Sequence, residues 1–215
     1  EAKVAQNNAE LIGYRSQINP HFLFNTLECM RSMAHIYRAE PIEHIVSSMA
    51  KMFRYSLYSP MQVTLEDELR HVESYVGVMN QRFLDKFHLK IQVPPETRRC
   101  TLVSMILQPI VENAILHGFP AKQKYCCISI SATGSGDNWV IRMTDNGRGI
   151  SKEKCREINE DLRLKKDDPH EEKSSISLRN IYRRMTLVTG GNFLMELRSR
   201  ESFYTQVECR FGMKR

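Results

Sequence analysis

The first 84 residues carry apolar side chains at helical spacing. Between residues 42 and 57 these side chains recur every three or four positions, which predicts an amphipathic helix with one apolar face: Ile42, Ile45, Val46, Met49, Met52, Phe53 and Leu57. Ser59-Pro60 interrupts the pattern. Thr64 and Asp67 have the spacing of a capping box, with Asp as the acidic partner, and predict the start of a further helix. Its apolar side carries Leu65, Leu69, Val72, Val76, Met79 and Phe83.

From residue 87 onward the apolar positions follow a different period. Apolar and polar side chains alternate over residues 87–93, which predicts a half-buried strand that ends at Pro94-Pro95. We expect a helix over about 102–117, bent at Pro109 and capped by Gly118. The rest of the pattern predicts a helix from about Ser177 to Gly190-Gly191 and strands over about 125–133, 138–144, 193–199 and 203–211.

This order of elements predicts two domains. Helices occupy residues 1–84, and a mixed α/β unit follows over residues 85–215. The expected fold class is therefore α + α/β. Residues 151–173 are polar and highly charged, and this composition favours a mobile segment within the second domain.

The composition is that of a globular chain. Of the 215 residues, 41% are hydrophobic and 26% are charged, and no apolar run approaches the roughly 20 residues that cross a bilayer. The net charge is +6, but the basic residues are scattered and no aromatic residues alternate with them, so we expect no nucleic-acid partner. Six cysteines without a CxxC spacing indicate neither a zinc site nor a redox motif, and fit reduced thiols in the cytosol.

A polar stripe runs along the first helix. Gln17, His21 and Asn25 are four residues apart and therefore share one face, while apolar side chains cover the rest. Pro20 either bends this helix or begins it with Asn19 as the cap. A neutral imidazole nitrogen can attack phosphorus, so His21 is a candidate nucleophile. The plainer interpretation is a surface histidine that is hydrogen-bonded to Asn25.

A second group of polar residues surrounds the predicted strand end at Asp145. The run from Asp145 to Gly149 has the form DxGxG, in which a buried carboxylate can accept a hydrogen bond from an adenine amino group while the glycines let the backbone approach a ligand. A tight turn is the alternative. Upstream, Asn113 and His117 share a helix face, and an amide oxygen suits Mg²⁺. Glu112 faces elsewhere and could accept a proton from an attacking imidazole, unless this is simply a solvated helix surface.

Together the motifs NPHFLFN, PIVENAILHG and TDNGRGI resemble those of sensor histidine kinases of the LytS/YesM type. The resemblance covers nearly the whole chain. It implies a helical hairpin domain for dimerisation and phosphoacceptance over residues 1–84, followed by a GHKL (Bergerat) α/β sandwich ATPase domain over residues 85–215. It also implies a homodimer through a four-helix bundle, and a flexible lid within the charged stretch 151–173.

The same resemblance implies a reaction and its residues. His21 would be the phosphoacceptor, Glu112 the base and Asn113 the ligand of Mg²⁺. The remaining residues of the ATP site would be His117, Asp145, Gly147, Gly149, Ser177 and Leu178. ATP would phosphorylate His21, and the phosphoryl group would pass to an aspartate of a response regulator.

The resemblance further implies a place in the cell. Because the chain begins at Glu1 rather than Met, we interpret it as a fragment of a longer protein. The expected parent is a bacterial plasma-membrane sensor whose anchor precedes this cytoplasmic part.

Three positions depart from the family pattern. Ser175-Ile176-Ser177-Leu178 replaces a motif that commonly reads GIGL or SIGL, Ser202 to Thr205 replaces a GxGT turn, and Leu116 stands where a lysine often precedes the histidine. Ser177 can cap its helix and present free amides to an anion, and Arg179 or Arg183 can supply positive charge. The departures leave an alternative open, namely a degenerate kinase that signals as a dimeric scaffold without phosphoryl transfer.

Overall fold

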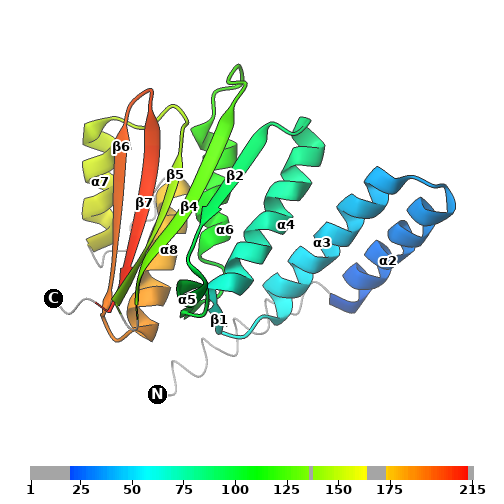
Figure 1. Ribbon diagram of the computed structural model, residues 1–215, viewed down its shortest axis with the longest axis horizontal. Coiled ribbons are helices and arrows are strands. Elements are labelled where there is room, and N and C mark those ends of the chain that lie inside the picture. The colour runs from blue at the N-terminus through cyan, green and yellow to red at the C-terminus, as the bar shows by residue number, and fades with distance from the viewer. Residues whose placement is uncertain (1–19, 136–137, 164–172, 213–215) are drawn as a thin grey trace. The chain divides into compact units, whose positions relative to one another are not determined.

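The computed structural model describes residues 20–135, 138–163 and 173–212 (Figure 1). The chain forms two compact units that divide between Tyr58 and Ser59. None of the helices in the described ranges combines the length and apolarity needed to cross a membrane.

The first unit is a helical hairpin of α2 (Pro20–Ile36) and α3 (Glu40–Tyr58). Pro20 is the first described residue of α2, and the predicted cap Asn19 lies outside the described residues. Ala34 accepts a hydrogen bond from the Ala39 amide (2.8 Å) at the turn. Where the two helices face each other, the buried side chains are Leu27, Ala34 and Val46.

The second unit is built on a mixed five-stranded sheet with the order β2-β4-β5-β7-β6. The strands are β2 (Phe87–Gln92), β4 (Cys126–Ser135), β5 (Asn138–Asp145), β6 (Phe193–Arg200) and β7 (Tyr204–Phe211). β2 is parallel to β4, and the other neighbours are antiparallel. A separate two-stranded ribbon joins β1 (Gln62–Thr64) to β3 (Thr101–Val103).

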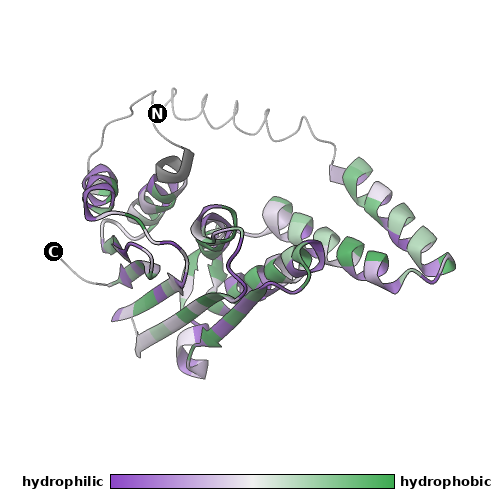
Figure 2. Cartoon of the chain, turned by 90° about the horizontal axis from the view of Figure 1, so that it is seen from above, coloured by the Kyte–Doolittle hydropathy of each residue, from purple (hydrophilic) through white to green (hydrophobic). Residues whose placement is uncertain are grey.

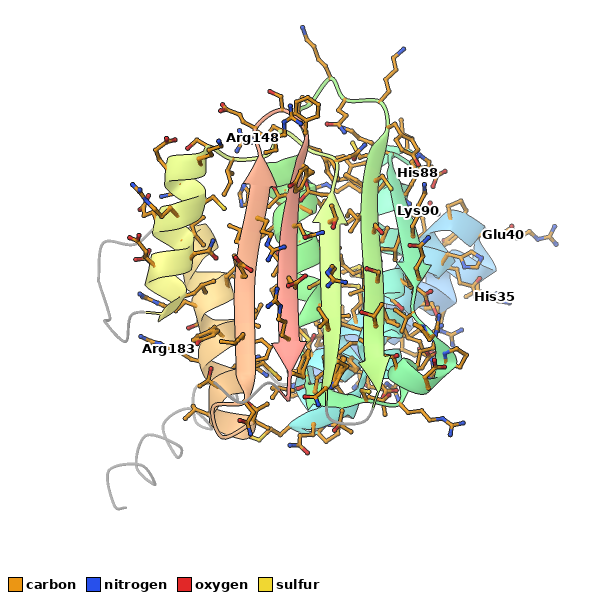
Figure 3. All side chains as sticks on the ribbon, turned by 60° about the vertical axis from the view of Figure 1, so that its left-hand side comes forward. His35, Glu40, His88, Lys90, Arg148 and Arg183 are labelled. Atoms are coloured by element: carbon orange, nitrogen blue, oxygen red, sulfur yellow. The ribbon has the colours of Figure 1, made fainter. Side chains whose placement is uncertain are left out.

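Helices cover one face of this sheet (Figure 2). They are α4 (Leu65–Phe83), α6 (Leu107–Asn113), α7 (Lys152–Arg163) and α8 (Lys173–Val188), with the short α5 (Pro95–Arg98) and a π-helical turn η1 (Ala114–Gly118) between strands. The strands alternate, so that their inner side chains form the core with the helices while polar side chains such as His88 and Lys90 occupy the other face (Figure 3). The core includes Leu69, Val72, Leu107, Ile128, Ile130, Ile141, Met185 and Phe193.

The capping box at the start of α4 is confirmed. The Thr64 hydroxyl accepts from the Asp67 amide, and the Asp67 carboxylate accepts from the Thr64 amide at 3.1 Å. Asn80, near the other end of α4, exchanges two 2.8 Å hydrogen bonds with the backbone of Phe87 in β2. Packing therefore joins α4 to the sheet unit, whereas our predicted domain boundary after residue 84 assigns it to the helical domain.

The predicted helix over 102–117 is wrong at its start. Residues 101–103 form β3, and the helix begins only at Leu107, after Met105 adopts a left-handed conformation (φ 61°). Pro109 consequently lies in the first turn, where a helix tolerates proline without a bend. The irregularity comes instead at the π-helical turn η1, which leads to Gly118.

The charged stretch 151–173 is more ordered than its composition predicts. Its first part is α7, begun by a hydrogen bond from the Lys154 amide to the Ser151 hydroxyl (3.2 Å). Two apolar residues of this helix, Ile158 and Leu162, are buried. Asn159 also pairs with the Leu197 backbone of β6 at 2.7 and 2.8 Å. The remaining candidate for a lid, residues 164–172, lies outside the described residues.

Candidate functional site

A cavity of about 460 Å³ lies between the inner face of the sheet and helices α6, α7 and α8. Most of its walls are apolar, formed by Ile110, Val111, Ala114, Ile128, Met143, Ile150, Ile158, Leu178, Leu197 and Val207. A smaller polar set converges on it: Asn113, His117, Thr144, Asp145, Arg148, Lys154 and Thr205. A largely apolar cavity with a few convergent polar groups is the usual form of a small-molecule site.

Asp145 reaches the cavity because of strand alternation. Trp139, Ile141 and Met143 are the inward positions of β5, and Asp145 is the next in that series. Asp145 is 7% exposed, and its carboxylate accepts a 2.9 Å hydrogen bond from the Gly147 amide. Burial raises the pKa of Asp145, and the backbone amide of Gly147 partly opposes that rise. The site thus holds a buried acceptor at the end of a strand.

The two glycines of the DxGxG run let the loop pass between neighbouring backbones. A Cβ at Gly147 would overlap the carbonyl of Gly118, and one at Gly149, which has φ 62°, would overlap the carbonyl of Arg200. The Arg148 amide donates to the Gly118 carbonyl at 2.8 Å. The requirement for glycine is therefore steric at both positions.

The turn between β6 and β7 meets the same loop. The Ser202 amide donates to the Arg148 carbonyl at 2.6 Å, and Arg148 lies at this end of the sheet (Figure 3). Ser202 takes up the left-handed conformation (φ 66°) that a glycine turn would use. Ser202 to Thr205, which lack the expected glycines, thus still close on the loop, and Thr205 lines the cavity.

The helix α6 and its π-helical extension carry the next predicted residues. Asn113 and His117 line the cavity, as their shared face predicts. Glu112 is half-buried, does not line the cavity, and acts electrostatically on Tyr75 of α4. Leu116 is 51% exposed and is absent from the lining.

Our prediction for Ser177 as a helix cap is wrong. The helix α8 begins at Lys173, four residues earlier, so Ser177 lies inside it and its amide is not at the helix start. Leu178 lines the cavity, whereas Ser177 does not. Arg179 and Arg183 are likewise absent from the lining.

Sequence reasoning missed the two basic residues of the cavity, Arg148 and Lys154. Arg148 lies within the DxGxG run, where attention went to the glycines. Lys154 lies on α7. The high charge of this segment predicts a mobile stretch rather than a helix. The apolar pair Ile158 and Leu162, four residues apart, was the signal that could have found this helix.

His21 is the second residue of α2, in the other unit, and is exposed. The Asn25 amide nitrogen lies 3.3 Å from its Nδ1 and 3.4 Å from its Nε2. The predicted polar pair on one helix face is therefore present, and the ring is open to solvent.

The donor set at the cavity suits a metal that arrives with its ligand. Within the described residues no three His, Cys, Asp or Glu side chains gather closely enough to hold an ion. Mg²⁺ commonly takes one or two protein oxygens and fills its shell with water and phosphate. The Asn113 amide at the cavity wall fits that mode of binding.

Comparisons with known proteins agree with this geometry. The histidine kinase family model matches residues 9–87, and the model of histidine kinase-, DNA gyrase B- and HSP90-like ATPases matches residues 100–214. Sensor protein LytS of Bacillus subtilis is 26% identical over 96% of this chain and 34% of its own length. Sensor protein kinase HptS of Staphylococcus aureus is 35% identical over 68% of this chain and 28% of its own length.

Among solved structures, the histidine kinase domain of the Erythrobacter litoralis EL346 blue-light activated histidine kinase is similar, with a TM-score of 0.49 and 12% identity. That similarity covers 99% of this chain and 94% of the other. The chain spans 34% of the length of its LytS relative. By the sequence matches, the chain belongs to the histidine kinase-, DNA gyrase B- and HSP90-like ATPase family and is a sensor histidine kinase core of the LytS type.

Proposed function

We propose that the chain transfers the γ-phosphoryl group of ATP to His21 and then to an aspartate of a response regulator. The observation that carries this proposal is the cavity, where a buried carboxyl and two basic side chains meet otherwise apolar walls. Apolar walls suit an adenine ring, Asp145 suits its amino group, and Arg148 and Lys154 suit phosphate charge. The motif order NPHFLFN, PIVENAILHG, TDNGRGI supports the same assignment.

In the proposed reaction a neutral nitrogen of His21 attacks the γ-phosphorus. A nitrogen–phosphorus bond forms, the bond to the bridging oxygen breaks, and ADP leaves. Glu112 accepts the ring proton. His21 and the cavity belong to different compact units, so the reaction requires the units to bring them together. Correct placement of two reactants accounts for much of the catalysis of phosphoryl transfer.

The remaining site residues hold the nucleotide. Gly147 and Gly149 let the loop pack against neighbouring backbone beside the cavity, and His117 and Leu178 line the same cavity. Asn113 would hold Mg²⁺, which would neutralise charge on the phosphates. Ser177 is proposed only as a neighbour of Leu178, since its amide does not face an open helix start.

The proposed partners follow from the hairpin and the family. Exposed apolar residues on α2 and α3 suit a homodimer through a four-helix bundle, and the phosphohistidine would pass its group to a response regulator. The relatives are about three times longer than this chain, which supports a parent protein with further parts. We propose that this parent is anchored in a bacterial plasma membrane with the present chain in the cytoplasm.

The test is to incubate the chain with ATP labelled on its γ-phosphate and Mg²⁺, beside His21→Gln. We expect acid-labile label on the wild-type protein and none on the variant. His35→Gln is the matched control, because His35 is also exposed on α2 and should leave labelling unchanged.

Two outcomes would contradict the proposal. Label that persists on His21→Gln would place the acceptor elsewhere. Absence of label together with absence of nucleotide binding by calorimetry would favour the dimeric scaffold instead.

A further inference from the structure

Helix α4 presents a polar stripe to α6. Glu68, His71 and Tyr75 follow each other at spacings of three and four residues and are all buried. The Glu68 carboxylate accepts from the amides of Met105, Ile106 and Leu107 at 2.7, 2.8 and 2.9 Å. The first contact of the stripe therefore holds the start of α6.

The next contact lies one turn further along α4 and one residue beyond Leu107 on α6. The His71 ring is hydrogen-bonded through Nε2 to the Gln108 side-chain oxygen. The two helices run in the same direction here, because Gln108 follows in sequence the amides that donate to Glu68. The next turn of α4 carries Tyr75, and the next turn of α6, four residues beyond Gln108, carries Glu112.

The third contact is incomplete. Tyr75 is 3% exposed, and within the described structure its hydroxyl has no hydrogen-bond partner. A buried hydroxyl without a partner is costly, so an acceptor within reach of the Tyr75 hydroxyl would relieve that cost. Burial first, and then the negative charge of Glu112, raise the pKa of Tyr75, while Arg82 lowers it. The hydroxyl therefore keeps its proton and can donate.

We propose that the Tyr75 hydroxyl donates a hydrogen bond to the Glu112 carboxylate and orients it to accept the proton of His21. Tyr75 is then a positioning residue, acting through Glu112. The half-buried Glu112 completes the contact by a change of rotamer. This inference rests on the proposed function, in which Glu112 is the base.

The test compares Tyr75→Phe with the wild-type chain. We expect the rate of labelling at saturating ATP to fall roughly 10-fold to 100-fold, as for the loss of a hydrogen bond to a charged group, with an unchanged KM for ATP. We expect no fall in melting temperature, because the variant removes only an unpaired hydroxyl. A wild-type rate would overturn the inference, and so would a lower rate accompanied by a changed KM or a lower melting temperature.

A second variant separates the local effect from a general one. Thr97→Val removes the other buried hydroxyl oxygen without a partner in the described structure, on α5 and away from the cavity, and should label at the wild-type rate. A slow Thr97→Val would mean that the rate responds to buried hydroxyls in general and would overturn the role of Tyr75.

A double-mutant cycle tests the route through Glu112. Tyr75→Phe should slow labelling no further in a Glu112→Gln background, and full additivity would contradict the inference. Absence of label on the wild-type protein would refute the proposed function itself. Label on wild type with no effect of Tyr75→Phe would refute only the role of Tyr75.

Discussion

At Asp145 folding and ligand binding make opposite demands. Burying a carboxylate is unfavourable for folding, and the raised pKa of Asp145 reflects that penalty. The Gly147 amide offsets only part of it. A site that keeps a charged acceptor under these conditions gains a strong hydrogen bond when a donor enters, which is what the amino group of adenine would supply.

Asp145→Asn should separate the effect of Asp145 on folding stability from its effect on nucleotide binding. The folded-state pKa lies above the unfolded value near 3.8, so the stability that protonation provides is complete below that value and is lost as pH rises through the folded pKa. The variant does not titrate there. At pH 7 we therefore expect a melting temperature at or above that of the wild type, a difference that disappears as pH falls toward 4. Affinity for an ATP analogue should fall about tenfold or more.

Calorimetric titration and thermal melts across this pH range would check both expectations. Asp161→Asn, on the partly exposed surface of α7, is the matched control and should change neither quantity. An Asp145→Asn variant that binds the nucleotide like the wild type would argue against Asp145 as the adenine acceptor.

At the scale of elements, α6 depends on a residue of another helix. The helix has only seven residues, and its own sequence supplies no side-chain cap. Instead, the Glu68 carboxylate of α4 accepts hydrogen bonds from three backbone amides at the start of α6. The helix α6 also carries Asn113, which lines the cavity. The contact between α4 and α6 therefore helps to position the candidate site.

Glu68→Ala should destabilise the chain by roughly 3 kcal/mol, because buried amides lose their acceptor at about 1–3 kcal/mol each and the site relaxes in part. Urea unfolding followed by circular dichroism measures the change. Glu73→Ala, at an exposed position of α4, should stay within about 0.5 kcal/mol of the wild type. Equal midpoints for the two variants would contradict the capping role.

At the scale of the whole molecule, the helical hairpin leaves apolar side chains in solvent. On α2 and the turn after it the exposed set is Phe22 (70%), Met30 (49%), Met33 (52%), Ile36 (74%) and Tyr37 (77%). Apolar surface of this kind marks an interaction site in a folded protein. Two such hairpins can bury these faces against each other in a four-helix bundle.

Met33→Glu should therefore weaken self-association at least about tenfold, because a charge would be placed in the apolar contact. Sedimentation equilibrium measures the dissociation constant. Leu187→Glu is the matched control: Leu187 is 82% exposed, but it lies on α8 in the other unit and should not affect association. A wild-type chain that is monomeric at all concentrations would rule out the proposed dimer.

Much of the architecture was predictable from local patterns. The period of two over residues 87–93 and the period of three to four over residues 42–57 each correspond to an observed element, β2 and α3. Thr64 and Asp67 lie three residues apart, so their capping box could be recognised in the sequence alone. The DxGxG run also placed Asp145 at a strand end, because alternation along β5 is local as well.

Other features depend on contacts between residues far apart in the chain. Glu68 lies 37 to 39 residues before the amides from which it accepts hydrogen bonds. The local pattern therefore predicts a helix over residues 102–106, where the structure has β3 and the turn at Met105. Lys154 lies at the cavity on a helix that is held to β6 by contacts between distant residues, such as the pairing of Asn159 with Leu197, 38 residues away.

The sequence by itself therefore determined the family, much of the order of elements and several of the polar residues that line the cavity, among them Asn113, His117 and Asp145, because periodicity and motifs are properties of neighbouring residues. The tertiary structure alone decided where α6 begins, which basic side chains reach the cavity, and that the buried Tyr75 hydroxyl has no partner among the residues that the structure describes. Those outcomes depend on packing between distant segments, whose geometry no local pattern encodes.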